Sequence, residues 1–179
     1  MTETDRDRGV PLETELKLRI RAVEPWFDRL EALGFRCAFP LQEEVSLLWD
    51  REAELQNRDC ALRTRRYGTH CSLTWKGPRQ RHATLKIRPE LETLVEDGEA
   101  LENILRALGY VPVLRMVKHR AVYRKEPWVV CLDRTPFGAF LEMEGPEADL
   151  SALRETLGLS EADVEPRSYP DLYRLHGAS

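Results

Sequence analysis

Alternating charged residues near the N-terminus, Glu13-Thr14-Glu15-Leu16-Lys17, are the first feature of this sequence that could do chemistry. In an extended strand, residues two apart share a face, so Glu13, Glu15 and Lys17 would point to one side. Two carboxylates at that spacing repel each other unless a cation lies between them, and a divalent metal with oxygen ligands would serve. The alternative is the solvated outer face of an amphipathic strand. This segment alone does not decide between the two.

Three later segments carry like charges at the same spacing, namely Arg63 and Arg65, Lys118 and Arg120, and Glu142 and Glu144. Such pairs cost free energy unless a ligand of opposite charge bridges them. If the strands close into a barrel, its interior becomes a polar channel with an acidic side for a cation and a basic side for an anion. A metal-bound polyphosphate would satisfy both sides. An open two-layer sheet would instead leave the charged face in water, and composition does not exclude that.

The elements that would position these side chains are mostly short alternating strands. Strands are predicted over residues 12–21, 42–50, 61–67, 72–76, 85–94, 116–124, 129–133 and 140–144. Helices are predicted over 25–33, 99–108 and 149–157, because apolar residues recur at helical spacing and each run stops at a glycine. After the strand that ends at residue 50, a polar hairpin or loop is predicted through residues 57–59, and Pro89 indicates an edge, a bulge or a strand end. Roughly eight strands in hairpin order predict an α+β fold, an antiparallel sheet or barrel with helices outside.

A short segment recurs in the two halves of the chain. Ala32-Leu33-Gly34 and Ala107-Leu108-Gly109 each follow a charged alternating strand and a helix, and each precedes further strands. Helix ends commonly read this way, so either a structural repeat or coincidence explains the match.

Size and composition narrow the classes of protein. At 179 residues the chain suits one domain, predicted over residues 11–175 after a polar tail at residues 1–10. The net charge of −4 gives no sign of general nucleic-acid affinity. The apolar runs are too short for a membrane span and the first residues are charged, unlike a signal peptide, so we expect a cytoplasmic protein without membrane contact. The four cysteines form no C-x-x-C pair, which favours free thiols.

The sequence lacks the signature motifs of several other enzyme classes. It contains no G-x-S-x-G, P-loop, G-x-G-x-x-G or H-E-x-x-H signature. The histidines are isolated and are interpreted as surface or core residues rather than ligands: His70, His82, His119 and His176. His119 should face outward if its neighbours Lys118 and Arg120 face a channel.

Taken in order, seven elements of the sequence resemble the CYTH domain, that is, the triphosphate tunnel metalloenzyme superfamily. They are Glu13-x-Glu15-x-Lys17, Leu62-Arg63-x-Arg65, Thr74-x-Lys76-Gly77-Pro78, Lys86-x-Arg88-x-Glu90-x-Glu92, Lys118-x-Arg120, Leu132-Asp133 and Glu142-x-Glu144. This superfamily includes class IV adenylyl cyclases, thiamine triphosphatases and inorganic triphosphatases. The resemblance covers about residues 11–175 and implies a closed antiparallel barrel of about eight strands whose lumen is a charged tunnel, with helices packed outside.

The resemblance also implies roles for the charged residues. Mg²⁺ or Mn²⁺ would be held by Glu13, Glu15, Glu142 and Glu144, with Asp133 and Glu92 as candidates for extra acidic contacts. The triphosphate oxygens would be gripped by Lys17, Arg63, Arg65, Lys76, Lys118 and Arg120, and Lys86 and Arg88 are further candidates. Lys76 either orients the nucleophile or serves as one more phosphate clamp. The segment Tyr169–Tyr173 resembles the short C-terminal helix near the tunnel end.

Three functions follow as hypotheses. The first is a metal-dependent hydrolase of triphosphates such as tripolyphosphate, ATP or another organic triphosphate. The second is a class IV adenylyl cyclase, which would also need a purine pocket, and the third is a non-catalytic polyphosphate- or nucleotide-binding module. Leu48-Trp49-Asp50 stands where many members carry Tyr-Phe-Asp or Tyr-Tyr-Asp, which argues against thiamine triphosphate as the specialised substrate, and Trp49 is expected to pack on the outer face. The oligomeric state stays open between monomer and homodimer.

Overall fold

Short strands and glycine-stopped helices make up most of the chain. The computed structural model describes residues 9–177, so residues 1–8 of the predicted tail lie outside the described part. The strands are β1 (Leu12–Ile20), β2 (Arg36–Asp50), β3 (Ala61–Tyr67), β4 (His70–Lys76), β5 (Lys86–Val95), β6 (Val111–Lys125), β7 (Trp128–Thr135) and β8 (Gly138–Glu144). The helices are α1 (Pro25–Ala32), α2 (Glu54–Asn57), α3 (Gly98–Ala107), α4 (Glu147–Thr156) and α5 (Tyr169–His176), with a 3₁₀ turn η2 (Glu161–Asp163).

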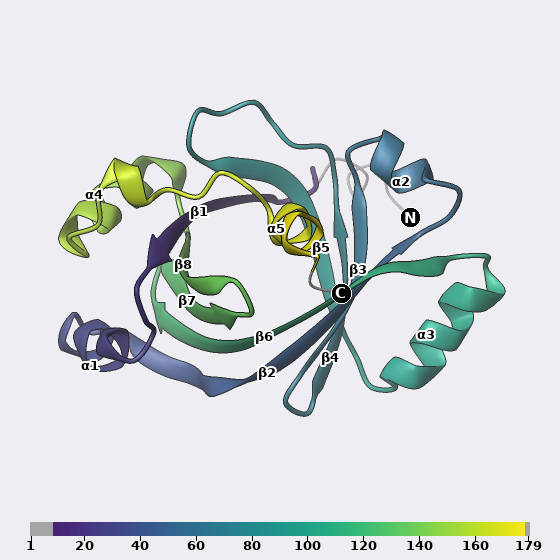
Figure 1. The fold of residues 1–179 in the computed structure, drawn as a ribbon, viewed down its shortest axis with the longest axis horizontal. Helices are drawn as coiled ribbons and strands as arrows, with labels where there is room; N and C mark the ends of the chain where they lie inside the picture. Colours follow the sequence, from purple (N-terminus) through teal and green to yellow (C-terminus); the bar gives the residue numbers. More distant parts are fainter. Residues whose placement is uncertain (1–8, 178–179) are drawn as a thin grey trace, which may run out of the picture.

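All eight strands form one closed antiparallel barrel in the order β1-β5-β4-β3-β2-β6-β7-β8 (Figure 1). β1 completes the closure, because its first residues pair with β5 and the rest pair with β8. The predicted closed barrel with helices outside is therefore confirmed, and an open sheet with its charged face in bulk water is excluded. Within residues 9–177 no helix has the length and apolar character of a membrane span.

The two halves of the chain occupy equivalent places in the barrel. Exchanging β1–β4 with β5–β8 reproduces the same cyclic order, with β1 beside β5 and β2 beside β6. Gly34 after α1 and Gly109 after α3 both have φ of +85°, a backbone conformation that glycine adopts without steric cost. This supports a structural repeat as the explanation for the matching Ala-Leu-Gly segments.

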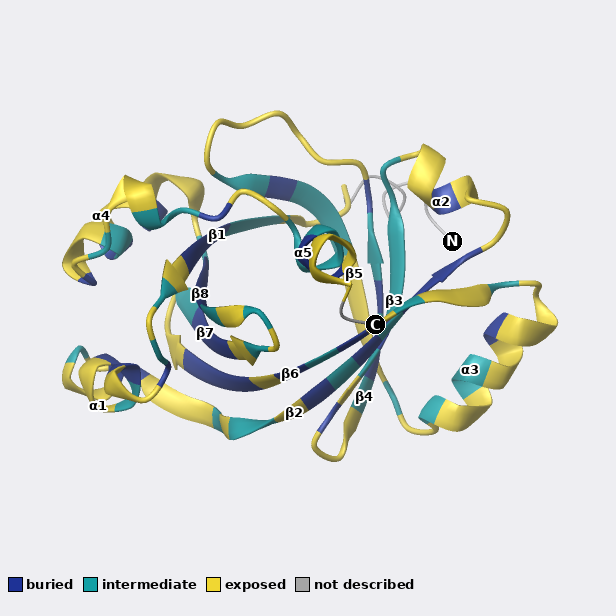
Figure 2. Cartoon of the chain, viewed as in Figure 1, coloured by how far each residue is buried: buried dark blue, intermediate teal, exposed yellow. Residues whose placement is uncertain are grey.

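The hydrophobic core lies between the barrel wall and the helices on one side. Leu16 and Leu18 of β1 and Leu141 of β8 are buried there against Leu30 of α1 and Leu150 of α4. Because side chains alternate across each strand, burying these residues outward turns Glu15, Lys17 and Glu142 inward. Figure 2 shows the buried strands of the wall and the exposed outer surfaces of the helices.

The structure differs from the prediction mainly in strand length and in one helix. β2 and β6 both exceed the predicted 42–50 and 116–124, because they pair with each other from Arg36↔Arg124 to Asp50↔Val111 through three register shifts. α2 begins where a loop was expected, since the Asp50 carboxylate accepts hydrogen bonds from the backbone N–H groups of Leu55 and Gln56.

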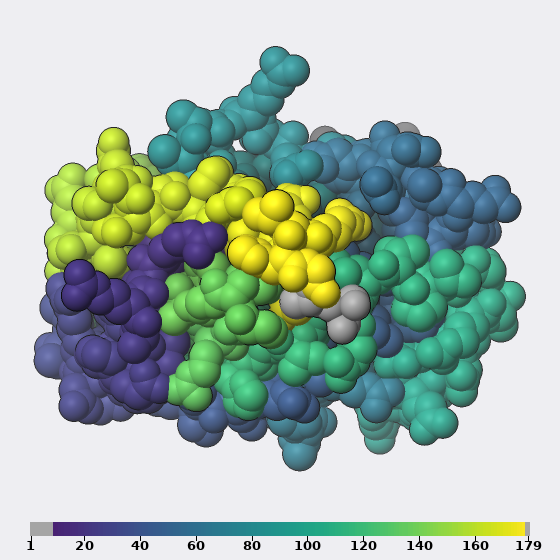
Figure 3. All heavy atoms as spheres, viewed as in Figure 1, coloured from purple at the N-terminus to yellow at the C-terminus, as the bar shows by residue number. Residues whose placement is uncertain are grey.

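The C-terminal segment returns to the barrel. Val164 bridges to Leu18, and the N–H of Glu165 donates to the carbonyl of Lys17, so this segment lies along β1. Ser168 then caps α5, which lies over the barrel opening in the view of Figure 1. In Figure 3 the yellow C-terminal segment forms part of the molecular surface on this side.

Candidate functional site

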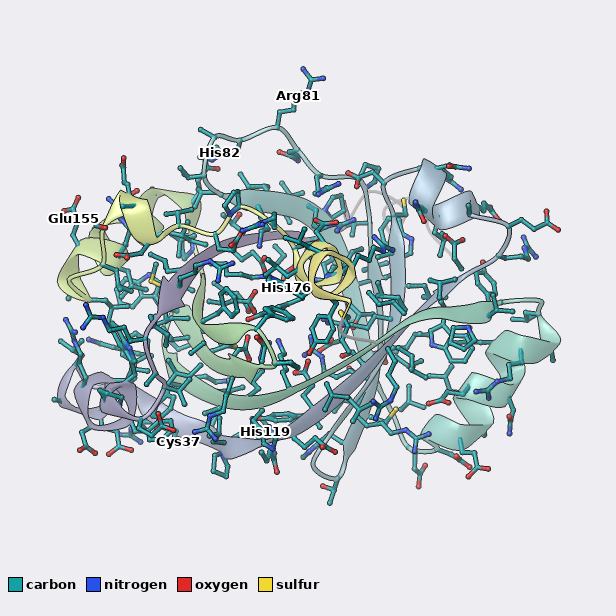
Figure 4. The ribbon with its side chains drawn as sticks, viewed as in Figure 1. Cys37, Arg81, His82, His119, Glu155 and His176 are labelled. Carbon is teal, nitrogen blue, oxygen red and sulfur yellow. The ribbon has the colours of Figure 1, made fainter. Side chains whose placement is uncertain are left out.

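Charged side chains line a cavity of about 380 Å³ inside the barrel. The lining includes every predicted site residue except Asp133 and Glu92, namely Glu13, Glu15, Lys17, Arg63, Arg65, Lys76, Lys86, Arg88, Lys118, Arg120, Glu142 and Glu144. None of the four histidines lines it. All four are exposed, and His119 and His82 lie on the outer side of the barrel in Figure 4.

An acidic cluster lies where β1 meets β8. Glu13, Glu15 and Glu144 each offer a carboxylate oxygen within 4.8 Å of the others, and the strand register places Glu15 opposite Glu144. Burial raises the pKa of Glu13 to about 9, helped by a hydrogen bond with Glu90 and opposed by Lys76. Burial also raises the pKa of Glu144. Crowded carboxylates with hard oxygen ligands fit Mg²⁺ or Mn²⁺, whose charge would favour their ionised forms.

Two lysines flank the acidic cluster. Lys76 Nζ lies 2.6 Å from Glu13 and 2.5 Å from Glu90, and Lys86 Nζ lies 3.0 Å from Glu15. Burial would raise the pKa of Glu15, but Lys86, with help from other lysines, outweighs it and the pKa is lowered. Glu15 is therefore the member of the cluster that ionises most readily.

Arg63 and Arg65 of β3 lie on the wall opposite the acidic cluster, given the order of strands around the barrel. Their side chains are only 15% and 20% exposed, yet within the described chain the Nε of each has no hydrogen-bond partner. Arg63 donates one bond, to the Thr74 hydroxyl at 3.2 Å. Buried donors without acceptors cost free energy. The two guanidinium groups therefore keep donors available for an anion.

Lys118 and Arg120 of β6 are instead paired within the protein. Lys118 Nζ donates to Asp133 at 3.0 Å, and Arg120 donates to both Asp133 oxygens at 2.7 and 2.6 Å and to Glu142. The Tyr169 hydroxyl also donates to Asp133. The structure thus places Asp133 among cations and outside the acidic cluster, and its role as a metal contact stays a prediction.

Lys17 connects the lumen with the segment that precedes α5. Its Nζ lies 3.3 Å from Glu142 and 3.4 Å from the centroid of the Tyr169 ring, and it donates to the carbonyl of Arg167 at 3.4 Å. Burial lowers the pKa of Lys17 to about 8, although Glu142 opposes the shift. Glu142 therefore lies with Lys17 and Arg120, two residues before Glu144 on β8 and outside the acidic cluster.

Two other predicted contacts are engaged elsewhere. Arg88 donates to the carbonyls of Gly77 at 2.7 Å and Asp59 at 2.8 Å, which holds the segment after β4 against β5. Glu92 accepts a bond from the Thr74 hydroxyl at 2.7 Å and lies 3.6 Å from Arg63, so it too is outside the acidic cluster.

Sequence reasoning gave no role to Glu44 or to Glu90, and both contact the predicted site. Glu90 pairs with Lys76, and Glu44 lies near Arg65, Lys118 and Arg120. The sequence feature that could have identified Glu44 as a lumen residue was its alternation with Gln42 and Ser46 on a predicted strand. Position on a face does not reveal which charges lie next to it.

Tyrosines of α5 enter one end of the lumen. The Tyr169 ring lies beneath Lys17 and Lys118, and Tyr173 packs with Leu48 and Met116 and donates its hydroxyl to the carbonyl of Val117.

Trp49, in the segment that departs from the family pattern, packs on the outer face as expected. Its Nε1 donates to the Thr64 hydroxyl at 2.9 Å, and Arg106 of α3 lies over its ring.

Comparison with known proteins gives a match over most of the chain. The model of the CYTH domain family matches residues 11–169. The putative adenylate cyclase of Methanocaldococcus jannaschii is 27% identical over 175 residues, which is 92% of this chain and 99% of that protein.

Two solved structures have the same fold. A putative adenylate cyclase from Vibrio parahaemolyticus gives a TM-score of 0.78 at 23% identity, covering 93% of this chain and 99% of that one. A Hippeastrum protein, described as a putative adenylyl cyclase that reveals a dominant triphosphatase activity, gives a TM-score of 0.61 at 20% identity, covering 92% and 96%.

Proposed function

Because this chain belongs to the CYTH domain family, we propose that it is a divalent-metal-dependent hydrolase of triphosphate substrates, inorganic or organic. One observation carries the proposal: a single cavity has the acidic cluster of Glu13, Glu15 and Glu144 on one wall and the incompletely paired guanidinium groups of Arg63 and Arg65 on the wall opposite. The first wall suits a hard cation and the second suits phosphoryl oxygens.

The residues of the lumen would act mainly by holding the substrate in line and stabilising its charge. A divalent cation bound to the acidic cluster would supply further neutralisation of the phosphoryl oxygens. Arg63 and Arg65 would donate to these oxygens from the other wall. Water attacking the terminal phosphorus would break its bond to the bridging oxygen and release orthophosphate.

Lys76 has the position of a residue that contacts both the cluster and the substrate. Its Nζ bridges Glu13 and Glu90, and burial is offset by these carboxylates so that its pKa is raised. A lysine that stays protonated orients an attacking water or clamps a phosphoryl oxygen, and it does not act as a general base.

A class IV adenylyl cyclase is the second candidate, because the M. jannaschii relative is named a putative adenylate cyclase. Cyclisation requires a place for the purine beside the triphosphate. Leu48 and Met116 are apolar residues of the cavity wall, but both pack against Tyr173 of α5. A purine could reach these two residues only if α5 moved, whereas hydrolysis does not require α5 to move. We therefore place the hydrolase first.

Incubation of the purified protein with tripolyphosphate, ATP and thiamine triphosphate, each with Mg²⁺ or Mn²⁺, tests the proposal. Orthophosphate release that stops with EDTA is expected. Cyclic AMP and pyrophosphate from ATP would identify a cyclase instead. Tight tripolyphosphate binding without turnover of any substrate would identify a binding module.

A further inference from the structure

Glu44 is a buried carboxylate in the lumen for which the proposed reaction has no role. It lies on β2 and is 3% exposed. Three cations surround it at the same distance: Arg65 Nε, Lys118 Nζ and Arg120 Nε each lie 3.7 Å from one of its oxygens.

None of these three contacts is a hydrogen bond, because 3.7 Å exceeds the usual range for N–H···O. The bond that Glu44 does make, from the Ser46 hydroxyl at 3.4 Å, is long. Within the described chain, Glu44 Oε2 and Arg65 Nε are both buried without hydrogen-bond partners. The carboxylate thus lies where the three cations converge, but it accepts a hydrogen bond from none of them. A phosphoryl oxygen would be drawn to the same point.

The lumen as a whole has little surplus positive charge. Lys17, Arg63, Arg65, Lys76, Lys118 and Arg120 each have a carboxylate within 3.9 Å, and Glu44 provides the one for Arg65. The cations around Glu44 hold its pKa well below the ordinary range despite burial, so it stays negative. A bare polyanion entering near Arg65 would meet this charge at close range.

We propose that the buried charge of Glu44, which lies among Arg65, Lys118 and Arg120, makes triphosphate binding depend on the divalent cation. This inference rests on the proposed function. Repulsion from Glu44 weakens binding of the free anion, whereas cations at the acidic cluster restore the attraction, so the two ligands bind with positive coupling. The substrate would therefore be the metal complex of the triphosphate rather than the free anion.

Calorimetric titration with tripolyphosphate, in Mg²⁺ and separately in EDTA, measures this coupling without turnover. Wild type is expected to bind well in Mg²⁺ and weakly in EDTA. Glu44→Gln removes the charge but keeps the shape, so its affinity in EDTA should rise about tenfold or more while its affinity in Mg²⁺ changes less. Glu44→Asp retains the charge and should keep most of the wild-type metal dependence.

The matched control is Glu43→Gln, the same substitution one position away. Glu43 is exposed, lies opposite His119 in the register of β2 and β6, and should give wild-type affinities in both buffers. Arg65→Gln provides a second test that does not depend on how Glu44→Gln folds. It removes a cation and leaves the charge of Glu44 less compensated. The ratio of the affinity in Mg²⁺ to the affinity in EDTA should therefore increase.

Failure of this inference differs from failure of the proposed function. An unchanged ratio of affinities in folded Glu44→Gln, or an unchanged ratio in Arg65→Gln, would overturn the role of Glu44 and leave the hydrolase proposal standing. No binding of tripolyphosphate by wild type in Mg²⁺ would overturn both.

Discussion

Glu165 anchors the segment that carries α5 to the barrel, and its replacement by glutamine should loosen that anchor. The carboxylate is 2% exposed and accepts bonds from Arg19 Nε at 2.9 Å and from Arg167 Nε and Nη2 at 2.6 and 2.8 Å. Glutamine keeps the shape but offers one acceptor oxygen to two guanidinium groups. We expect Glu165→Gln to fold and to be less stable than wild type.

The size of the loss follows from the pKa of Glu165. Hydrogen bonds from Arg167, opposed by burial, lower it from the ordinary 4.5 to about 2. At about 1.36 kcal/mol per pKa unit, this corresponds to about 3.4 kcal/mol at most. The side chains of Arg19 and Arg167 are 42% and 46% exposed, so solvent screens both pairs and reduces the expected loss to about 1–2 kcal/mol. For a chain of this size, the melting temperature would fall by about 2–8 °C.

The difference between the two proteins should also depend on pH in one direction. Because the folded-state pKa lies below the unfolded value, this stabilisation is fully present above about pH 4.5 and disappears as the pH falls toward about 2. Urea unfolding at pH 7 and at pH 4 measures it. Glu161→Gln is the control, since that side chain is 82% exposed and lies 3.7 Å from Arg154. Equal stabilities of Glu165→Gln and wild type at pH 7, or equal losses in variant and control, would refute the reasoning.

Three further predictions concern the lumen. Glu13→Gln should abolish metal-dependent phosphate release while the circular dichroism spectrum stays unchanged, because it removes a carboxylate of the acidic cluster; retained turnover would refute the metal assignment. Arg63→Lys keeps the charge but loses the planar fork, so the KM for tripolyphosphate should rise about tenfold in steady-state assays, and an unaltered KM would exclude direct contact. Tyr169→Phe keeps the ring against Lys17 but removes the donor to Asp133, which should cost about 1 kcal/mol in urea unfolding; no measurable cost would show that this bond is not formed.

Clean alternation in the sequence predicted an antiparallel sheet or barrel, and the resemblance to the CYTH domain family predicted that it closes. Period-two alternation in β1, β3 and β8 places charged residues on one face and apolar residues on the other, and only closure gives that charged face an enclosed interior. The additional length of β2 and β6 could not be predicted. Each strand contains a proline, Pro40 in β2 and Pro112 in β6, which argues against a strand in the sequence, and their pairing across bulges depends on the partner strand.

The faces of the charged residues could be predicted from the sequence, but their neighbours could not. Lys76 of β4 meets Glu13 of β1 across β5, and Arg120 of β6 meets Glu142 of β8 across β7. Each contact joins strands that are not adjacent, because long side chains that point into a narrow lumen reach past the strand between them. Such pairs depend on the order of strands around the closed barrel, which alternation does not encode.

Arg63 and Arg65 therefore need an anionic ligand more than Lys118 and Arg120 do. Arg120 lies directly opposite Asp133, and the same carboxylate serves Lys118. Arg63 and Arg65 lie opposite Thr74 and Ser72 on β4 and opposite Leu48 and Ser46 on β2, all of them uncharged. Their nearest carboxylates stand too far away for hydrogen bonds. An entering phosphoryl group would gain most from these two guanidinium groups, since those of β6 already have acceptors and would have to exchange them.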